Sequence, residues 1–271
     1  MDLALHRHGP ADGVPLVLLH AFPFDSRMWD GVLAHLPDDV PVLTLDAPGF
    51  GDSPAFDVVA GALGRRGEPS LETCADAVAA TLRGAGVERA VVAGLSMGGY
   101  TLLALAERHR SLLAAVGLLD TKAEADTDEA RAKRLRVADE AATRGADVVA
   151  GSLEDMLAPG TRAERPDVVA RVRTWLAQAP PAGIAWAQRA MAARPARLTA
   201  LEDLEVPGLV LRGAQDTLSP QEAAEAMVQR LSAGGELVVV PRAAHLSAVE
   251  DPAAVAAALA RLHARAVGHR P

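Results

Sequence analysis

Hydrophobic residues along this chain form short unbroken runs that alternate with longer segments of helical spacing. An unbroken apolar run is typical of a strand buried on both faces, as in a parallel sheet covered by helices. Such runs predict strands at residues 17–20, 41–46, 90–94, 113–120, 208–213 and 236–241. The alternation of strand and helix signals predicts an α/β layer fold.

Two helix starts are marked by residues that favour the first turn. Ser219-Pro220-Gln221-Glu222 matches a capping box with proline at the first helical position. Asp251-Pro252 precedes a C-terminal segment in which Val255, Leu259 and Leu262 share one apolar face. We therefore expect one helix to begin near residue 220 and another near residue 252.

Residues 122–197 break the alternation, because they contain no strand-like run. Helical segments are expected there at roughly 127–143, 146–157, 166–178 and 182–194, and Pro159-Gly160, Pro166 and Pro180-Pro181 are expected to separate them. The sequence thus predicts an α/β core formed by residues 1–121 and 198–271, with residues 122–197 as an all-helical cap, or lid, over the site.

A serine between glycines follows the predicted strand at 90–94 and precedes a helical run that starts at Tyr100. The segment Gly94-Leu95-Ser96-Met97-Gly98-Gly99 has the G-x-S-x-G pattern of a nucleophile elbow, in which a strained turn lifts the serine hydroxyl above the sheet edge. Side chains at positions 94 and 98 would collide with neighbouring backbone. An ordinary turn is the alternative, but the strand–turn–helix context favours Ser96 as a nucleophile.

A serine nucleophile needs a base, and the base needs an orienting carboxylate. In this class of site the chain order is serine, acid, histidine. Asp216 lies in the turn after the predicted strand at 208–213, and His245 lies in the loop after the last predicted strand. The alternatives are a helix cap for Asp216 and a surface position for His245. Asp120, at the end of the strand at 113–120, is the rival acid.

The loop after the first predicted strand is expected to complete an oxyanion hole. Its donors would be the backbone N–H groups of Phe22 and Met97, with His20 bracing the loop. The side chains expected to line a mainly apolar acyl pocket are Phe24, Trp175, Trp186 and Met191. The alternative is that the tryptophans only anchor the cap to the core.

Composition narrows the classes of function. A net charge of −8 argues against a nucleic-acid partner or an anionic membrane surface, and no apolar run approaches the length of a spanning helix. Cys74 is the single cysteine, which excludes an intrachain disulfide, and the first residues lack a signal-peptide pattern, so we expect a cytoplasmic protein. His6 and His8 share a strand face without further ligands at suitable spacing, so no metal site is expected.

The motifs together resemble the α/β-hydrolase fold superfamily. The matching segments are residues 20–23, 46–53, 94–99, 213–216, 244–245 and 250–252. The chain looks most like compact bacterial carboxylesterases, enol-lactonases and cofactor-free perhydrolases with a four-helix cap. The resemblance implies a mostly parallel central sheet flanked by helices, with the cap inserted after the sixth strand. Ala21 departs from the glycine usual at that position in the family, and Ser96 argues against the dehalogenases and epoxide hydrolases, which carry aspartate there.

These residues predict a serine hydrolase that cleaves a small to medium carboxylic ester or lactone through Ser96, His245, Asp216 and an acyl-enzyme, without a cofactor. The alternatives use the same triad for perhydrolysis, carbon–carbon bond hydrolysis, thioester hydrolysis or acyl transfer. A ligand-binding sensor on a hydrolase scaffold is a different class, which the intact triad disfavours. The expected partner is a small ester-like molecule, and the expected state is a monomer or weak homodimer.

Overall fold

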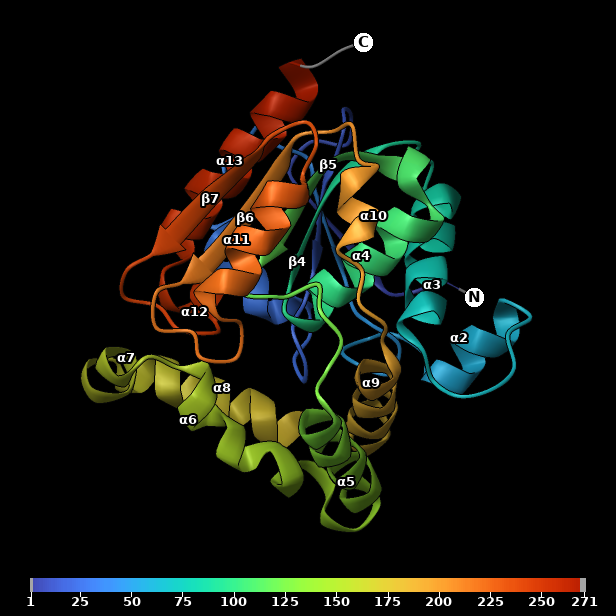
Figure 1. Ribbon diagram of the computed structural model, residues 1–271, viewed down its shortest axis with the longest axis vertical. Helices are drawn as coiled ribbons and strands as arrows, with labels where there is room; N and C mark the ends of the chain where they lie inside the picture. The colour runs from blue at the N-terminus through green and yellow to red at the C-terminus, as the bar shows by residue number, and fades with distance from the viewer. Residues whose placement is uncertain (1, 269–271) are drawn as a thin grey trace.

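The computed structural model describes residues 2–268, and a seven-stranded sheet forms its centre (Figure 1). The strands are β1 (Leu5–His8), β2 (Leu16–Leu19), β3 (Val42–Leu45), β4 (Ala90–Leu95), β5 (Leu113–Leu119), β6 (Gly208–Gly213) and β7 (Gly235–Val240). Their order is β1-β3-β2-β4-β5-β6-β7, with β1 antiparallel to β3 and every other pair parallel. The predicted α/β architecture is confirmed.

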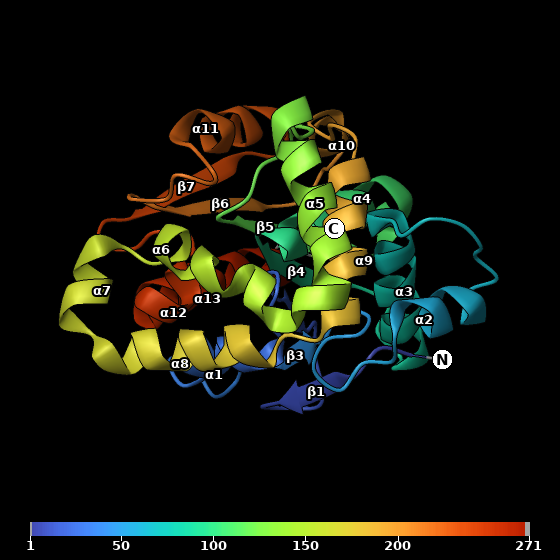
Figure 2. The ribbon, with the colours of Figure 1, turned by 90° about the horizontal axis from the view of Figure 1, so that it is seen from below.

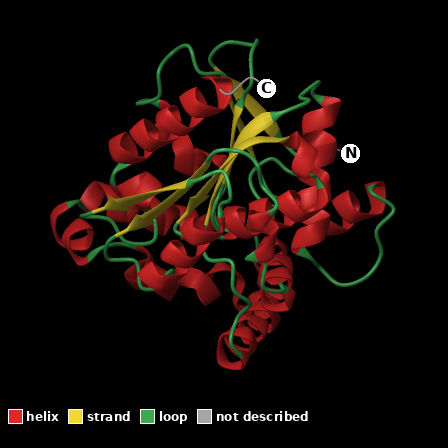
Figure 3. Ribbon diagram, turned by 45° about the horizontal axis from the view of Figure 1, so that its top comes forward, coloured by secondary structure: helices red, strands yellow, loops and turns green. Residues whose placement is uncertain are grey.

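Helices cover both faces of the sheet, which explains why its central strands lack a polar face (Figure 3). One face carries α1 (Asp30–Leu33), α12 (Ser247–Glu250) and α13 (Pro252–Gly268), and the other carries α3 (Leu71–Gly84), α4 (Met97–Arg108), α10 (Thr199–Glu202) and α11 (Gln221–Arg230). The short elements α2 (Phe56–Ala62), η1 (Ser26–Trp29) and η2 (Arg110–Leu112) lie in the connections. Each apolar layer is therefore sealed between the sheet and one set of helices.

Both predicted helix starts are confirmed, because α11 begins at Gln221 and α13 at Pro252, but only one of the two expected N-terminal signals is present as a cap. Asp251 Oδ1 accepts a hydrogen bond from the Ala254 N–H at 3.1 Å, and the predicted apolar face of α13 is fully buried. The capping box at 219–222 is wrong, because α11 begins at Gln221 without a side-chain cap. The Ser219 hydroxyl instead donates to the Asp120 carbonyl at 2.9 Å. The Ser219 side chain is therefore bonded to a distant segment and does not accept a backbone N–H of α11.

Between β5 and β6 every regular element is helical, and all of these elements except α10 lie together beyond one end of the sheet (Figures 1 and 2). They are α5 (Asp128–Arg144), η3 (Gly145–Ser152), α6 (Leu153–Met156), α7 (Pro159–Glu164), α8 (Pro166–Gln178) and α9 (Pro181–Ala193). The predicted separator Pro159 begins α7, since proline suits the first turn of a helix. The insertion follows the fifth described strand and not the sixth, because only β1 to β5 precede it among residues 2–268.

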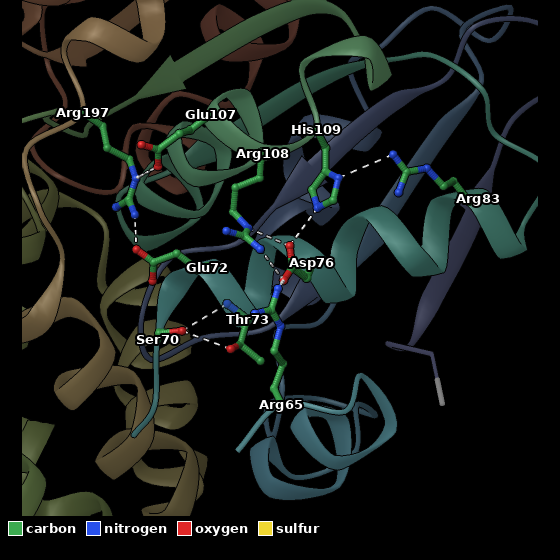
Figure 4. Close-up of polar contacts among 10 residues, drawn as sticks. All are labelled: Arg65, Ser70, Glu72, Thr73, Asp76, Arg83, Glu107, Arg108, His109 and Arg197. Atoms are coloured by element: carbon green, nitrogen blue, oxygen red, sulfur yellow. Dashed lines mark hydrogen bonds and ion pairs between the residues drawn. The ribbon is translucent and has the colours of Figure 1, made fainter. Parts of the chain in front are cut away.

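Two buried arginines join the C-terminal end of the cap to the core. Arg194 pairs with Asp126 at 2.7 Å, and its guanidinium lies 4.1 Å from the centre of the Tyr100 ring. Arg197 lies between Glu72 and Glu107, as Figure 4 shows, with its Nε 3.0 Å from Glu107 Oε2. The start and the end of the cap are thus held close together; its exact limits at residues 122 and 197 stay a prediction.

Two further contacts join the cap to the core near the carboxyl ends of the strands. The Trp186 indole N–H donates to the Pro48 carbonyl at 2.6 Å. The Glu250 carboxylate accepts the N–H of Ala158 in the cap at 2.8 Å and the N–H of Ala244 in the core at 2.7 Å. Among residues 2–268, none of the helices has the length and apolar character that crossing a membrane requires.

Candidate active site

The turn between β4 and α4 places Ser96 in a strained backbone conformation. Its φ is 53° and its ψ is −110°, in a region that residues with side chains rarely occupy. A Cβ atom at Gly94 would lie closer than 3.0 Å to the Gly98 carbonyl oxygen, and one at Gly98 closer than 3.0 Å to that of Leu19. Both glycines are therefore required on steric grounds, as the sequence predicted.

The structure brings the three predicted triad residues together. His245 Nε2 lies 2.8 Å from Ser96 Oγ, and His245 Nδ1 lies 2.9 Å from Asp216 Oδ2. Asp216 Oδ1 accepts the N–H groups of Leu218 at 2.8 Å and Ser219 at 3.2 Å, which fixes the carboxylate. An ionised Asp216 accepts only, so Nδ1 carries the proton and Nε2 is free to accept the serine proton.

Electrostatics prepare His245 to gain a proton. Burial opposes its charged form, but the charge and the hydrogen bond of Asp216 outweigh burial and raise the pKa of His245 above its usual value. Asp120 also raises this pKa, and the charge of Arg134 in the cap lowers it. The net effect favours an imidazole that takes a proton readily.

The rival acid, Asp120, occupies a different place. It is completely buried, and its carboxylate accepts the Gly213 N–H at 2.7 Å, the Ser247 N–H at 3.3 Å and the Ser247 hydroxyl. Burial, followed by the nearby charge of Asp216, raises the pKa of Asp120 to about 7. Since Asp216 and not Asp120 binds His245 Nδ1, the geometry favours Asp216 as the acid.

The two backbone N–H groups expected to form the oxyanion hole come from different segments, one directly after Ser96 and one in the loop after β2. Met97 is the first residue of α4, so its N–H has no acceptor within the helix. Phe22 lies in the loop after β2 and packs with Met97 in one apolar cluster. His20 Nδ1 donates to the Ala21 carbonyl at 2.9 Å, while Nε2 accepts the Ala47 N–H at 2.8 Å, which confirms that His20 braces this loop.

The predicted pocket residues form two groups. Phe24 and Trp175 meet edge to face with ring centres 6.0 Å apart. Trp186 and Met191 belong to the buried cluster that contains Met97, beside the serine. The hydrogen bond of Trp186 to Pro48 matches the alternative, that this tryptophan anchors the cap. Substrate contact by these four side chains stays a prediction.

One group of side chains could hold a cation, and the sequence argument missed it. Ligand atoms of His6, Asp46 and Asp52 lie within 4.8 Å of one another. The antiparallel pairing of β1 with β3 sets His6 opposite Thr44 and so brings it to Asp46, a neighbour that spacing along the chain does not reveal. Asp46 already accepts the N–H groups of Ser26 at 2.8 Å and Asp52 at 2.9 Å, so its burial is explained without an ion.

Comparison with known proteins places this fold and site in a family. The sequence profile described as "Alpha/beta hydrolase family" matches residues 16–258, and the chain therefore belongs to the α/β hydrolase family. The solved structure of a thermophilic esterase from Thermogutta terrifontis superimposes with a TM-score of 0.89 and 34% identity, covering 98% of this chain and 94% of that chain.

Curated relatives carry the names of ester- and lactone-cleaving enzymes. The chain is 25% identical over 250 residues to 3-oxoadipate enol-lactonase 1 of Acinetobacter baylyi, covering 92% of this chain and 88% of that protein. It is 28% identical over 261 residues to the pimeloyl-[acyl-carrier protein] methyl ester esterase of Aeromonas hydrophila, covering 93% and 95%. A match to the enzyme of that name from Legionella pneumophila spans only 23% of that protein, at 39% identity. The chain is thus a hydrolase with esterase and lactonase relatives.

Proposed function

We propose that the protein is a serine hydrolase that cleaves a small to medium carboxylic ester or lactone through an acyl-enzyme. The observation that carries the proposal is the unbroken hydrogen-bond chain from Ser96 through His245 to Asp216. Relatives named esterase and enol-lactonase support the ester class. The proposed partner is a small ester-like molecule, in a protein that acts as a monomer or weak homodimer in the cytoplasm.

In the proposed reaction, His245 Nε2 removes the proton of the Ser96 hydroxyl as Oγ attacks the acyl carbonyl carbon. The electron pair of the carbonyl moves to its oxygen, where the N–H groups of Phe22 and Met97 bind the negative charge. Asp216 stabilises the imidazolium. When the bond to the leaving oxygen breaks, His245 gives it the proton.

The acyl-enzyme is then hydrolysed by the same groups in reverse roles. His245 removes a proton from a water molecule as the water oxygen attacks the acyl carbon. The bond to Ser96 Oγ breaks, Oγ regains a proton from His245, and the carboxylic acid leaves. Each proton returns to its starting atom, so no external reductant, oxidant or metal is required by this sequence of steps.

The test is release of p-nitrophenol from acyl esters of increasing chain length, with Ser96→Ala as the knockout. Ser111→Ala, at an exposed serine, is the matched control and should keep wild-type turnover. Labelling with a fluorophosphonate measures nucleophilicity of Ser96 independently of turnover. Hydrolysis lost only in Ser96→Ala supports the proposal. Labelling without turnover of any ester or lactone would contradict the substrate class, and absence of both would contradict the serine mechanism.

A further inference from the structure

The end of β5 touches the segment that carries the candidate nucleophile. The Ser96 N–H donates to the Leu119 carbonyl at 2.9 Å, and the Thr121 hydroxyl donates to the Ser96 carbonyl at 2.9 Å. Ser96 is thus held on both sides of its Cα atom by the two neighbours of Asp120. In the sequence, Asp120 is the rival acid at the end of the predicted strand at 113–120.

The same strand end also holds the loop that carries Asp216. Asp120 Oδ1 accepts the Gly213 N–H at 2.7 Å, at the start of this loop. The Asp120 carbonyl accepts the Ser219 hydroxyl at 2.9 Å, at its end. Because both ends of the 213–219 loop are bonded to one residue, the position of Asp216 relative to β5 is fixed.

The second carboxylate oxygen of Asp120 reaches the loop that carries His245. Asp120 Oδ2 accepts the Ser247 N–H at 3.3 Å and the Ser247 hydroxyl, two residues beyond His245. Asp216, itself part of the first loop, also bonds both loops, through Leu218, Ser219 and His245. Among residues 2–268, Asp120 is the carboxylate from outside these two loops that bonds to both. One buried side chain therefore joins the candidate acid loop to the candidate base loop.

The backbone of Asp120 has a positive φ, a strained conformation that indicates a functional role for this residue. Its φ is 43°, and Ser96 is the only other non-glycine residue with positive φ among residues 2–268. A glycine would relieve this strain, but it would leave the Gly213 N–H and the Ser247 N–H without their acceptor. Strained residues of this kind concentrate at functional sites, where surrounding contacts hold them.

We propose that Asp120 is a positioning residue of this hydrolase, whose single buried carboxylate fixes the Asp216 and His245 loops in register with Ser96. The inference rests on the proposed function, because it assigns Asp120 a place in the same site. Asp120 touches neither His245 Nδ1 nor the Ser96 hydroxyl in its hydrogen bonds, so it acts through the residues it holds.

The positioning role has a measurable signature in the balance of kcat and KM. Displaced triad loops slow proton transfer from Ser96 to His245 and lower kcat, whereas the substrate pocket keeps its walls and KM stays close to that of wild type. The measurement is made at about pH 9, because Asp120, whose pKa is about 7, is then ionised in wild type. A role limited to folding would lower the melting temperature and leave kcat unchanged while the protein is folded.

The experiment compares wild type with Asp120→Asn on p-nitrophenyl butyrate. The asparagine oxygen still accepts the Gly213 N–H, but the amide cannot accept the Ser247 N–H and carries no charge. We expect kcat to fall about 10- to 100-fold with KM within about threefold. Asp120→Ala, which also loses the Gly213 contact, should lower kcat further.

Asp76→Asn is the control, since Asp76 is a buried carboxylate whose hydrogen bonds go to Arg65, Arg108 and His109 and not to the triad loops. It should lower the melting temperature and leave kcat unchanged. A kcat of Asp120→Asn within about twofold of wild type overturns the proposal, because the two loops would then keep their register without the Asp120 carboxylate. A loss as large as that of Asp216→Asn, about 10⁴-fold in a serine triad, also overturns it, because Asp120 would then be the acid.

The proposed function and the role of Asp120 can fail separately. If wild-type protein hydrolyses no ester, the rate at which a fluorophosphonate labels Ser96 is measured instead, since this reaction also needs His245 as a base. Labelling slower by about 10-fold or more in Asp120→Asn then supports the positioning role although the substrate class is wrong. Labelling at the wild-type rate overturns it.

Discussion

Asp76, on the helix that packs beside α4, is the clearest case of a carboxylate whose contribution to stability can be calculated from its surroundings. Figure 4 shows Arg65, Arg108 and His109 converging on it. Arg108 donates through Nε at 2.7 Å and Nη2 at 2.8 Å, and Arg65 donates at 2.6 Å. The perturbation is Asp76→Asn, which keeps the size of the side chain and removes its charge.

The magnitude follows from the pKa of Asp76. Burial opposes the charged form, but hydrogen bonds from Arg108, His109 and Arg65 outweigh burial and lower the pKa from 3.8 to about 2. A carboxyl with this difference between unfolded and folded states contributes about 2 kcal/mol to the free energy of unfolding at neutral pH. Because the folded pKa is the lower one, the contribution is complete above pH 3.8 and is lost as pH falls through about 2.

The assay is urea unfolding at pH 7.5 and pH 3. We expect Asp76→Asn to lose about 2 kcal/mol at pH 7.5 and about 1 kcal/mol at pH 3, where part of the wild-type contribution has gone. Asp39→Asn, at an exposed loop position, should change neither value. Equal losses at the two pH values would refute the reasoning, since the effect would then come from packing and not from the ionised carboxylate.

Three further predictions concern the site and its surroundings. Burial raises the pKa of the Cys74 thiol to about 12, so the native protein should not react with a disulfide reagent at pH 8, and one thiol should react after denaturation. Gly98→Ala places a Cβ against the Leu19 carbonyl and should cost at least about 2 kcal/mol in urea unfolding, whereas Gly61→Ala, with open space around it, should not destabilise the protein. Asp216 raises the pKa of His245 above 6.5, so kcat/KM should fall with decreasing pH around a midpoint above 6.5; a midpoint below 6.5 would contradict the triad electrostatics.

Features with a local physical cause could be predicted from the sequence. Strands β2 to β6 were readable because burial on two faces leaves unbroken apolar runs. The run at 236–241 also forms a strand, but burial on both faces is wrong for it, because β7 is an edge strand with Leu237 and Val239 exposed. Ser96 was readable because the elbow requires glycine at positions 94 and 98. His245 and Asp216 followed from chain order and from their places after strands, and the structure brings both to Ser96.

Features that depend on contacts between distant segments could not be predicted. Ser219 looked like a helix cap because its three following residues fit that motif, yet its hydroxyl bonds Asp120, 99 positions away in the chain. The carboxylate of Asp120 bonds Ser247 across 127 positions. The neighbours of His6 on the antiparallel strand β3 were missed for the same reason. The periodicity of hydrophobic residues and the spacing of motifs along the sequence carry no information about such contacts between distant residues.

The order of the strands explains why Asp120 is the residue in this position. The proposed nucleophile follows β4, the proposed acid follows β6 and the proposed base follows β7, and β5 lies between β4 and β6 in the sheet. Adjacent strands are about 4.8 Å apart, so Ser96 and Asp216 start about 10 Å apart, a gap that His245 spans with hydrogen bonds of 2.8 and 2.9 Å. With this strand order, the end of β5 lies beside both Ser96 and Asp216. A residue at that end can therefore fix the distance between Ser96 and Asp216 that the His245 imidazole must bridge. Since β7 is two strands from β5, a side chain at the end of β5 must extend past β6 to reach the loop that carries His245. The carboxylate of Asp120 does so by accepting the Ser247 hydroxyl.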